Sequence, residues 1–365
     1  MNTPQKENQH LVRLGVIGAG LVGAKHAAIA AGTPRCRLVG IADPNPAARQ
    51  LAENLSVDFY EDYLEMISTE ALDGVIIATP TDLHVSVGIA CAQNGLHLMV
   101  EKPIASDVQA AQELIDCAKQ RQIHLLVGHH RRFNPLVETA REVIQSGKIG
   151  RLVAVSVLWT LLKPNNYFDV EWRRKPGGGP VLINMIHDVD NLRYICGEIQ
   201  NVYAEVSSTA RGFEVEDTAC VTLRFQSGAL GTIITSDCVP SRWSYEATTG
   251  ENPDYFRTHE DCYLFFGTEG SLTFPTMKHV HYASPSAAGW LQPLQAEEIP
   301  VQQQDPLVRQ IDHFCAVIQG EENPRTSGED ALRTLSVIRA VLDSGGSGKP
   351  MALKVGDDIP LRRIS

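Results

Sequence analysis

The glycine pattern Gly18-x-Gly20-x-x-Gly23 constrains the fold of this chain most strongly, because it directly follows an apolar run at residues 11–17. In a strand–turn–helix unit, the first glycine permits the tight turn and the second lets the backbone approach a pyrophosphate. The third lets the helix pack closely on the strand. A helix starting at Leu21 and Val22 offers free N–H groups to phosphates. The pattern alone also fits a glycine-rich turn, so the residues that follow decide between the two.

An acidic residue stands where a dinucleotide-binding unit needs one. The next apolar run, residues 36–42, ends in Asp43, twenty residues after Gly23. A carboxylate at this distance accepts hydrogen bonds from the adenosine ribose hydroxyls and repels a 2′-phosphate. Pro44-Asn45-Pro46 follows without an arginine, although Arg49 lies close in sequence. The sequence therefore predicts NAD as the cofactor, with NADP less favoured.

Strand-like and helix-like runs alternate through the rest of the first 130 residues, which predicts a doubly wound parallel sheet of the Rossmann type. Ligands of such sheets bind at the carboxyl ends of the strands. Residues expected at such ends are Thr79, Pro80, Glu101 and Lys102. His84, shortly after Thr79 and Pro80, is a further candidate cofactor contact. A structural role at the start of a helix is the alternative for His84.

The periodicity changes after residue 150. Short β-rich runs extend from 151 to 274, and residues 226–229 and 267–270 join neighbouring runs like hairpin turns. Residues 284–306 are expected to form a loop, followed by helices at about 306–319 and 327–344. This pattern predicts an α+β domain with a large, mostly antiparallel open sheet. We therefore expect an NAD-binding domain at 1–130 and a substrate-binding and oligomerisation domain at 131–365.

An open sheet that helices leave uncovered on one face must bury that face elsewhere. We therefore expect a homodimer or homotetramer that assembles through the sheet of the second domain.

The segment 181–196 has the period of a helix. Leu182, Met185, Val189, Leu192 and Cys196 form an apolar stripe, and the opposite stripe contains Asn184, His187, Asp188 and Asn191. A histidine can exchange a proton near neutral pH. From the helix alone, however, His187 is more simply a residue on a solvated face.

Five segments then occur in an order that resembles the glucose–fructose oxidoreductase, inositol dehydrogenase and rhizopine-catabolism family, Gfo/Idh/MocA. They are the glycine pattern at 18–23, ATPTDLH at 78–84, EKP at 101–103, GHHRRFNP at 128–135 and GGGPVLINMIHDVD at 177–190. The resemblance implies nicotinamide-dependent oxidation or reduction of sugars, polyols or related alicyclic compounds. It also implies that Lys102 is the catalytic or substrate-orienting lysine, that a cis peptide bond precedes Pro103, and that the helix of His187 faces the nicotinamide.

One position departs from that family. Many of its sugar and inositol dehydrogenases carry an aspartate four residues before the histidine, where this chain has Ile183. An apolar side chain cannot relay a proton. Three readings stay open: Lys102 and His187 act alone, Asn184 anchors a substrate hydroxyl, or the substrate differs from the usual polyol.

Other candidate substrate contacts precede this helix. Arg131, next to Arg132, could bind a carboxylate or bridge the domains, and a structural ion pair is the alternative. Trp172 and Arg173 could form a platform for a sugar, and core packing is the alternative for Trp172. His129 and His130 lack the spacing of metal ligands, and no Cys-x-x-Cys pair occurs. The sequence therefore predicts no metal site.

We expect an NAD-dependent oxidoreductase that acts on the CH–OH group of a sugar, polyol or related small molecule. Lys102 would bind and polarise the substrate oxygen, and His187 would exchange its proton. Two alternatives remain: a dehydrogenase of a cis-dihydrodiol carboxylate or an imine, and a non-catalytic regulator that senses the dinucleotide.

Net charge, apolar content and cysteine usage indicate which partners and which cellular compartment to expect. The formal net charge is −11, which argues against a nucleic-acid partner. The N-terminus is polar, and the chain has no apolar stretch of membrane-spanning length, so we expect no membrane association. Eight scattered cysteines fit a reducing compartment. These features predict a cytoplasmic protein.

Overall fold

The computed structural model describes residues 11–353, and the chain divides into two units. Unit 1 comprises Met1–Asn134 and Gln304–Leu335, and unit 2 comprises Pro135–Gln303 and Ser336–Ser365. The expected domains, 1–130 and 131–365, thus differ from the units mainly in one segment, which returns to the N-terminal part of the chain.

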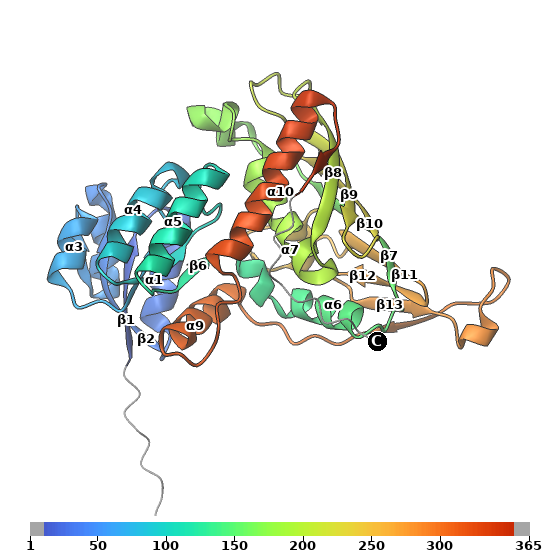
Figure 1. Ribbon diagram of the computed structural model, residues 1–365, viewed down its shortest axis with the longest axis horizontal. Helices are drawn as coiled ribbons and strands as arrows, with labels where there is room; N and C mark the ends of the chain where they lie inside the picture. Colours follow the sequence, from blue (N-terminus) through green and yellow to red (C-terminus); the bar gives the residue numbers. More distant parts are fainter. Residues whose placement is uncertain (1–10, 354–365) are drawn as a thin grey trace, which may run out of the picture. The chain divides into compact units, whose positions relative to one another are not determined.

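Helix α9 (Pro306–Ile318) explains that difference. Its side chains Ile311, Phe314, Cys315 and Val317 belong to the same buried cluster as strands of the N-terminal sheet. Burying a large apolar side chain stabilises a fold by about 1.5–3 kcal/mol. The apolar face of α9 therefore fastens this late segment to unit 1, where it lies beside α1 (Figure 1).

Unit 1 contains a six-stranded sheet in the order β3-β2-β1-β4-β5-β6, and all of its pairings are parallel. The strands are β1 (Val12–Ile17), β2 (Cys36–Ala42), β3 (Asp58–Tyr60), β4 (Gly74–Ile77), β5 (His97–Val100) and β6 (Leu125–Val127). The order reverses between β1 and β4, which makes their carboxyl ends the switch point where such sheets bind ligands. The doubly wound Rossmann sheet is confirmed.

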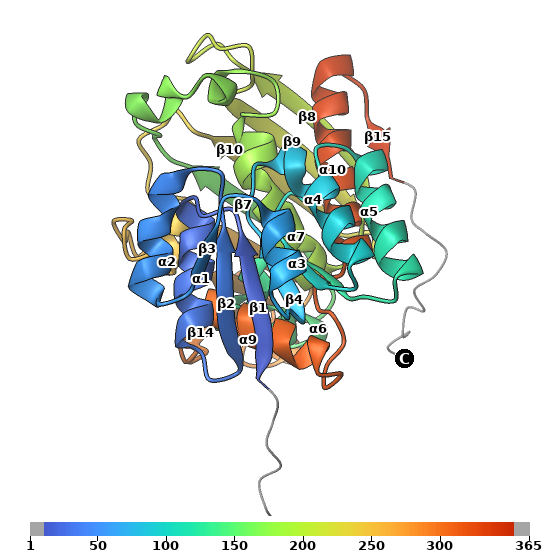
Figure 2. The same cartoon turned by 90° about the vertical axis from the view of Figure 1, so that its left-hand side faces the viewer.

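Helices cover both faces of this sheet. Figure 2 shows α1 and α2 on one side of the strands and α4 and α5 on the other. Their local sequences define their ends: in α5, for example, the Asp107 side chain caps the first turn by accepting from the N–H of Ala110. The helices are α1 (Leu21–Gly32), α2 (Arg49–Leu55), α3 (Tyr63–Thr69), α4 (Thr81–Gln93) and α5 (Val108–Gln120), with short turns η1 (Pro46–Ala48) and η2 (His130–Phe133).

Unit 2 contains a nine-stranded sheet in the order β14-β13-β12-β11-β7-β10-β9-β8-β15. Only β10 and β7 pair in parallel, so the mostly antiparallel sheet is confirmed. The strands are β7 (Leu152–Thr160), β8 (Ile199–Ser207), β9 (Thr218–Phe225), β10 (Leu230–Ser236), β11 (Tyr263–Gly267), β12 (Gly270–Phe274), β13 (Lys278–His281), β14 (Gln295–Glu298) and β15 (Met351–Ala352).

Strand β14 corrects one expectation, since residues 284–306 were expected to be a loop throughout. Its sequence, Gln-Ala-Glu-Glu, has low strand propensity, and all four side chains are exposed. Residues 295–298 therefore form a strand because they pair with β13, and their own sequence does not predict one.

Helices of unit 2 pack on one face of the sheet, where α6 contacts both α7 and β12. They are α6 (Pro135–Gln145), α7 (Ile186–Cys196) and the short α8 (Tyr245–Thr249), and α10 (Gly328–Ser347) contributes its later residues. Further turns are η3 (Asn165–Asp169), η4 (Glu171–Arg174) and η6 (Pro285–Ala287). Within residues 11–353, no helix combines the length and apolar character needed to cross a bilayer.

Candidate cofactor and substrate sites

The glycine loop of unit 1 has the backbone that its three glycines predict. Gly18 has a φ of +91°, which favours glycine, and a Cβ at Gly23 would lie 1.9 Å from the carbonyl oxygen of Gly18. A Cβ at Gly20 would meet no atom within 4 Å, so this glycine leaves open space. The N–H groups of Leu21 and Val22, in the first turn of α1, have no acceptor within the helix. The loop can thus hold a pyrophosphate.

Asp43 lies beside this loop at the end of β2. Its Oδ2 accepts a hydrogen bond from the N–H of Ala19 at 2.6 Å, and its Oδ1 accepts from the N–H of Asn45 at 2.8 Å. A hollow of about 320 Å³ opens here, lined by Ala19, Gly20, Ala24, Asp43, Asn45, Ala47, Ala48 and Leu51. The carboxylate on its wall suits the ribose of an adenosine, so these residues fit the adenosine half of a dinucleotide.

Arg49, the residue that left NADP open, has other partners. Its guanidinium lies 4.6 Å from the centre of the Phe59 ring and 3.7 Å from a carboxylate oxygen of Glu61. The guanidinium of Arg49 is thus directed toward Phe59 and Glu61.

The carboxyl ends of β4 and β5 carry the remaining candidates of unit 1. Thr79 Oγ1 is buried and has no hydrogen-bond partner among the described residues, while Pro80 is exposed. A buried hydroxyl without a partner is uncommon in a folded protein, and a bound ligand would supply one. The peptide bond between Lys102 and Pro103 is cis, as the resemblance implied.

Glu101 is held by the chain on both of its oxygens. Oε1 lies 2.7 Å from Nε2 of the buried His26, and Oε2 accepts from the N–H of Lys102 at 3.1 Å. Burial raises the pKa of this carboxyl. The hydrogen bond from His26 and the charges of His26, His130 and Lys102 outweigh that effect and lower the pKa to about 2. Glu101 is therefore ionised near neutral pH and fixes the backbone that carries Lys102.

His84 contacts the backbone just after the ends of both β4 and β5. Its ring is 1 % exposed, with Nδ1 2.9 Å from the carbonyl oxygen of Pro103 and Nε2 2.9 Å from that of Thr79. Burial lowers the pKa of His84, and the hydrogen bonds to the two carbonyl oxygens oppose this effect. The geometry favours the structural alternative for His84: it ties the end of β4 to the segment after β5.

Arg131 and Arg132 lie in η2 and are both buried. Arg132 forms an ion pair with Asp330 at 2.5 Å, which is the structural alternative considered for this pair of arginines. Arg131 is 3 % exposed and is packed into unit 1.

In unit 2, His187 belongs to a helix with an irregular start. Residues Val181–Met185 form a single π-helical turn, and α7 continues from Ile186. Such turns occur frequently at functional sites. The solvated face that the helix alone suggested is not observed, since His187, Asp188 and Asn191 are all buried. Helix α6 contacts α7, and the Asn191 amide donates to the Tyr263 hydroxyl of β11 at 3.1 Å.

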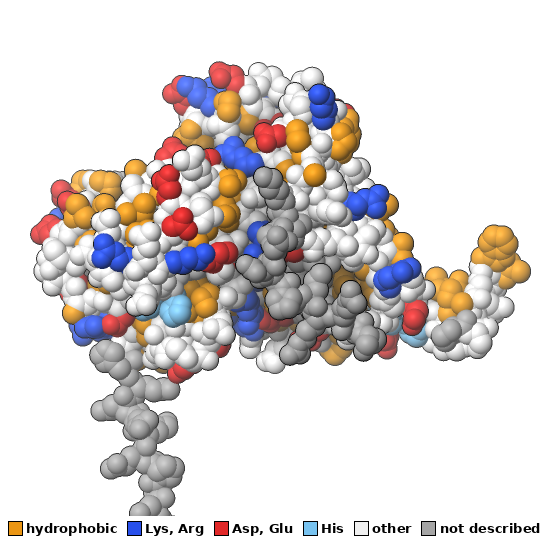
Figure 3. Space-filling view, viewed as in Figure 1, with side chains coloured by type: hydrophobic (Ala, Val, Ile, Leu, Met, Phe, Trp, Pro, Cys, Tyr) orange, Lys and Arg blue, Asp and Glu red, His pale blue; other side chains and the backbone are white. Residues whose placement is uncertain are grey.

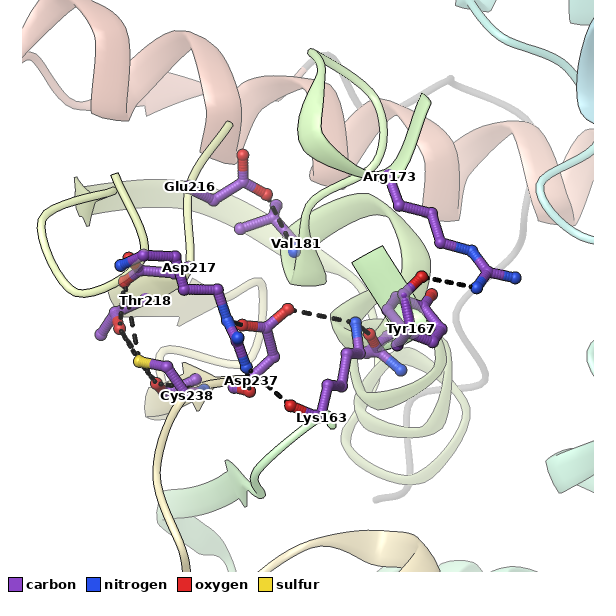
Figure 4. A network of polar contacts seen from close by, with 12 residues as sticks. Lys163, Tyr167, Arg173, Val181, Glu216, Asp217, Thr218, Asp237 and Cys238 are labelled. Carbon is purple, nitrogen blue, oxygen red and sulfur yellow. Dashed lines mark hydrogen bonds and ion pairs between the residues drawn. The ribbon is translucent and has the colours of Figure 1, made fainter. Parts of the chain in front are cut away.

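Asn184 and Lys163 meet beyond the end of β7, where the Lys163 ammonium donates to Oδ1 of Asn184 at 2.8 Å. The same ammonium lies 3.3 Å from a carboxylate oxygen of Asp237 (Figure 4). Arg211 also donates to Asp237, at 2.8 Å. Burial lowers the pKa of Lys163, against the opposing effect of Asp237. A buried lysine thus contacts the residue that stands three positions before His187.

The glycines before this helix make room for its surroundings. A Cβ at Gly178 would lie 2.4 Å from the carbonyl oxygen of Trp172, and one at Gly179 would lie 2.2 Å from a carboxylate oxygen of Glu216. That carboxylate accepts from the N–H of Val181 at 3.1 Å, and burial raises the pKa of Glu216. A side chain at residue 179 would therefore displace the Glu216 carboxylate from the start of the helix.

Trp172 and Arg173 lie in η4, next to these glycines. Trp172 is 50 % exposed, so core packing does not account for it. Arg173 lies over the ring of Tyr167, 4.0 Å from its centre, and donates to the carbonyl oxygen of Tyr167 at 2.7 Å (Figure 4).

Comparison with known proteins agrees with these two units. The family model described as "Oxidoreductase family, NAD-binding Rossmann fold" matches residues 12–129, and the Gfo/Idh/MocA C-terminal domain matches residues 137–273. The chain belongs to the Gfo/Idh/MocA family of oxidoreductases. The resemblance seen in the sequence is confirmed.

Relatives of known name include two bacterial proteins. The chain is 28% identical to the scyllo-inositol 2-dehydrogenase (NAD(+)) of Bacillus subtilis, over 95% of this chain and 98% of that protein. It is 34% identical to the rhizopine catabolism protein MocA of Rhizobium meliloti, over 51% of this chain and 57% of that protein.

A solved structure shares the fold. The WlbA dehydrogenase of Bordetella pertussis, in complex with NADH and UDP-GlcNAcA, superposes with a TM-score of 0.76 at 24% identity. The match covers 95% of this chain and all of that one.

Proposed function

We propose that this protein oxidises a CH–OH group of a cyclic polyol or sugar with NAD as the hydride acceptor. The observation that carries this proposal is the position of Lys102. It follows the carboxyl end of β5, in the same unit as the open space at Gly20 and the Asp43 carboxylate. When bound, the nicotinamide would take the hydride from the carbinol carbon.

The chain's own groups would then handle the substrate oxygen and its proton. Lys102, on a backbone fixed by Glu101, would donate a hydrogen bond to that oxygen. His187 would accept the hydroxyl proton, a role for which histidine is suited near neutral pH.

Asn184 and Lys163 would take over the position left by the absent aspartate. Lys163 and Arg211 share the carboxylate of Asp237, and Glu246 places a second negative charge near Lys163, so the two positive charges face two negative ones. A substrate with a carboxylate would find little uncompensated positive charge here, whereas a neutral hydroxyl could bind Asn184. These contacts favour a polyol or sugar over a cis-dihydrodiol carboxylate, and the NAD-dependent inositol dehydrogenase among the relatives supports the same class.

A substrate screen tests the proposal. The protein would be incubated with NAD⁺ and, separately, with inositols, aldoses, uronic acids and hydroxy acids, and NADH formation followed by absorbance. We expect turnover with at least one inositol or neutral sugar. Turnover with carboxylates alone would favour the dihydrodiol class, and NAD binding without turnover of any compound would favour the dinucleotide-sensing regulator.

Asp43→Ala is expected to narrow the preference for NAD over NADP. The wild-type carboxylate would accept hydrogen bonds from the ribose hydroxyls and repel a 2′-phosphate, so its removal should weaken NAD by about tenfold and strengthen NADP. Calorimetric titration of both dinucleotides measures this. Tighter binding of NADP than NAD by the wild-type protein would contradict the assignment.

The open face of the unit 2 sheet would mediate self-association. Leu230 and Ile234 on β10 and Phe266 on β11 project from the two strands that flank β7, on the face opposite the buried core, and each is 42–51% exposed. We expect a homodimer or homotetramer, because a central apolar patch of this kind is normally covered. Light scattering at micromolar concentration should give a multiple of 40.0 kDa; a constant 40.0 kDa would oppose this expectation.

We place the reaction in the cytoplasm. All eight cysteines are free thiols, four of them buried, which suits a reducing compartment.

A further inference from the structure

A cluster of two histidines and a glutamate lies at the far edge of the unit 2 sheet. His279 and His281 are two residues apart on β13, so both side chains project from the same face. Strand β14 pairs with β13 such that Glu297 stands directly opposite His279. The antiparallel register thus brings Glu297 to two histidines that precede it by 16 and 18 residues in the sequence.

The three side chains are close enough to share one ion. One donor atom from each lies within 4.8 Å of the others, and Nδ1 of His279 lies 3.1 Å from Oε1 of Glu297. The two imidazole rings are stacked, with centres 4.6 Å apart. Zinc–nitrogen and zinc–oxygen bonds of about 2.0–2.2 Å place neighbouring donors of a tetrahedral site roughly 3.4 Å apart. Small side-chain rotations would close the remaining difference.

The surroundings of the histidines favour ligation. Nδ1 of His281 lies 2.8 Å from the carbonyl oxygen of Tyr282, so a neutral ring donates there and leaves the lone pair of Nε2 available. Metal-binding histidines are commonly oriented in this way. His279 is 4 % exposed, and its Nε2 is buried without a hydrogen-bond partner in the described part of the chain. A Cβ at Gly270 would lie 2.9 Å from that nitrogen, so glycine gives the ring its space.

Lys148 is the natural competitor for the glutamate. Its ammonium lies 3.0 Å from Oε1 of Glu297, and both side chains are about half exposed. Nδ1 of His279 and the Lys148 ammonium both lie within hydrogen-bond distance of the same carboxylate oxygen, Oε1. An exposed ion pair is weak, and the ammonium can return to water when a divalent ion takes its place.

We propose that His279, His281 and Glu297 bind a divalent transition-metal ion of the zinc type, with water completing the coordination. Two imidazoles and one carboxylate suit such an ion better than Mg²⁺, which prefers oxygen ligands. The sequence predicted no metal site, from the spacing of His129 and His130 and from the lack of a Cys-x-x-Cys pair. The pair His279 and His281 becomes informative only when β14 places a carboxylate beside it.

The ion would fasten the edge of the sheet. β14 is the edge strand, its side chains are exposed, and β13 is its only neighbour. The intervening segment carries Trp290 and Leu291, which are 95% and 87% exposed. Figure 1 shows this segment as a projection from β13 and β14, and Figure 3 shows hydrophobic side chains over its end. A metal between the two strands would hold the base of this projection.

Zinc titration of the full chain, after removal of metal with a chelator, tests the site. We expect one Zn²⁺ per chain, a rise in Tm on addition of Zn²⁺, and no comparable response to Mg²⁺. His281→Gln and Glu297→Gln should each weaken Zn²⁺ binding by about tenfold or more. Lys148→Gln should strengthen it several-fold, because the competing cation is removed. His259→Gln, at an exposed histidine of the same unit, should bind like the wild type.

Circular dichroism would establish that each variant is folded, and the substitution at the half-exposed Glu297 is the mildest of them. Failure of the wild type to bind Zn²⁺, or unchanged affinity in both ligand variants, would overturn the proposal. The readout is metal binding, so neither result depends on the substrate or on NAD.

Discussion

Lys102→Met is expected to lower kcat by about a hundredfold or more, the scale typical of losing a group that assists proton transfer. The backbone at this position is fixed by Glu101 and by the His84 contact to Pro103, and neither requires the lysine ammonium. The fold and the affinity for NAD should therefore change little. Steady-state kinetics, thermal unfolding and NAD titration of the same preparation measure all three quantities.

Lys119→Met is the matched control. Lys119 is an exposed lysine of the same unit, on α5, and its ion pair with Glu329 at 3.1 Å would be lost in the variant. It should keep wild-type turnover. If Lys102→Met instead lowered Tm substantially while the surviving protein turned over normally, Lys102 would be a structural residue and the catalytic assignment would be wrong.

His187→Gln is expected to reduce kcat on the same scale and to change its pH profile. Glutamine retains hydrogen-bonding capacity but cannot accept a proton near neutral pH, so the limb of the profile that reports deprotonation of the base should disappear. A buried histidine that only supports α7 would give a different result. Its loss would lower Tm and leave the shape of the profile unchanged for the protein that remains folded.

The sequence predicted unit 1 well because local signals there agree with the tertiary structure. In β5, a continuous apolar run marks a fully buried parallel strand, and Pro103 marks its end. The glycine loop has one purpose at each glycine, and a Cβ at Gly23 would meet backbone. Such positions can be predicted from the sequence because the neighbouring backbone limits which residue type can stand there.

The sequence predicted unit 2 less well at positions whose burial or strand pairing depends on segments far away in the chain. The helix alone suggests a solvated stripe at His187, because the period of a helix shows which residues share a face and does not show what covers it. Strand β14 has no strand-like sequence and exists through its pairing with β13. Likewise, α9 reads as an ordinary amphipathic helix, and its sequence does not say which sheet it will cover.

Lys163 is the functional candidate that the sequence analysis missed, although it carried a usable signal. It closes an apolar run and is followed by Pro164, as Lys102 closes the run of β5 and is followed by Pro103. Its partners are harder to predict from the sequence, since Asp237 is 74 residues away. Only the sheet brings them together, so the contact of Lys163 with Asn184 requires the structure.

A double-mutant cycle on kcat tests most directly whether Lys102 and His187 form one catalytic site. It compares the wild type, Lys102→Met, His187→Gln and the variant with both changes, on the substrate found in the screen. If the two side chains act as a unit, the double variant should lose little more than the worse single variant, because removing either already disables the proton transfer. A loss equal to the product of the two single losses, on the order of ten-thousandfold, would mean that they act independently and would contradict the proposed site.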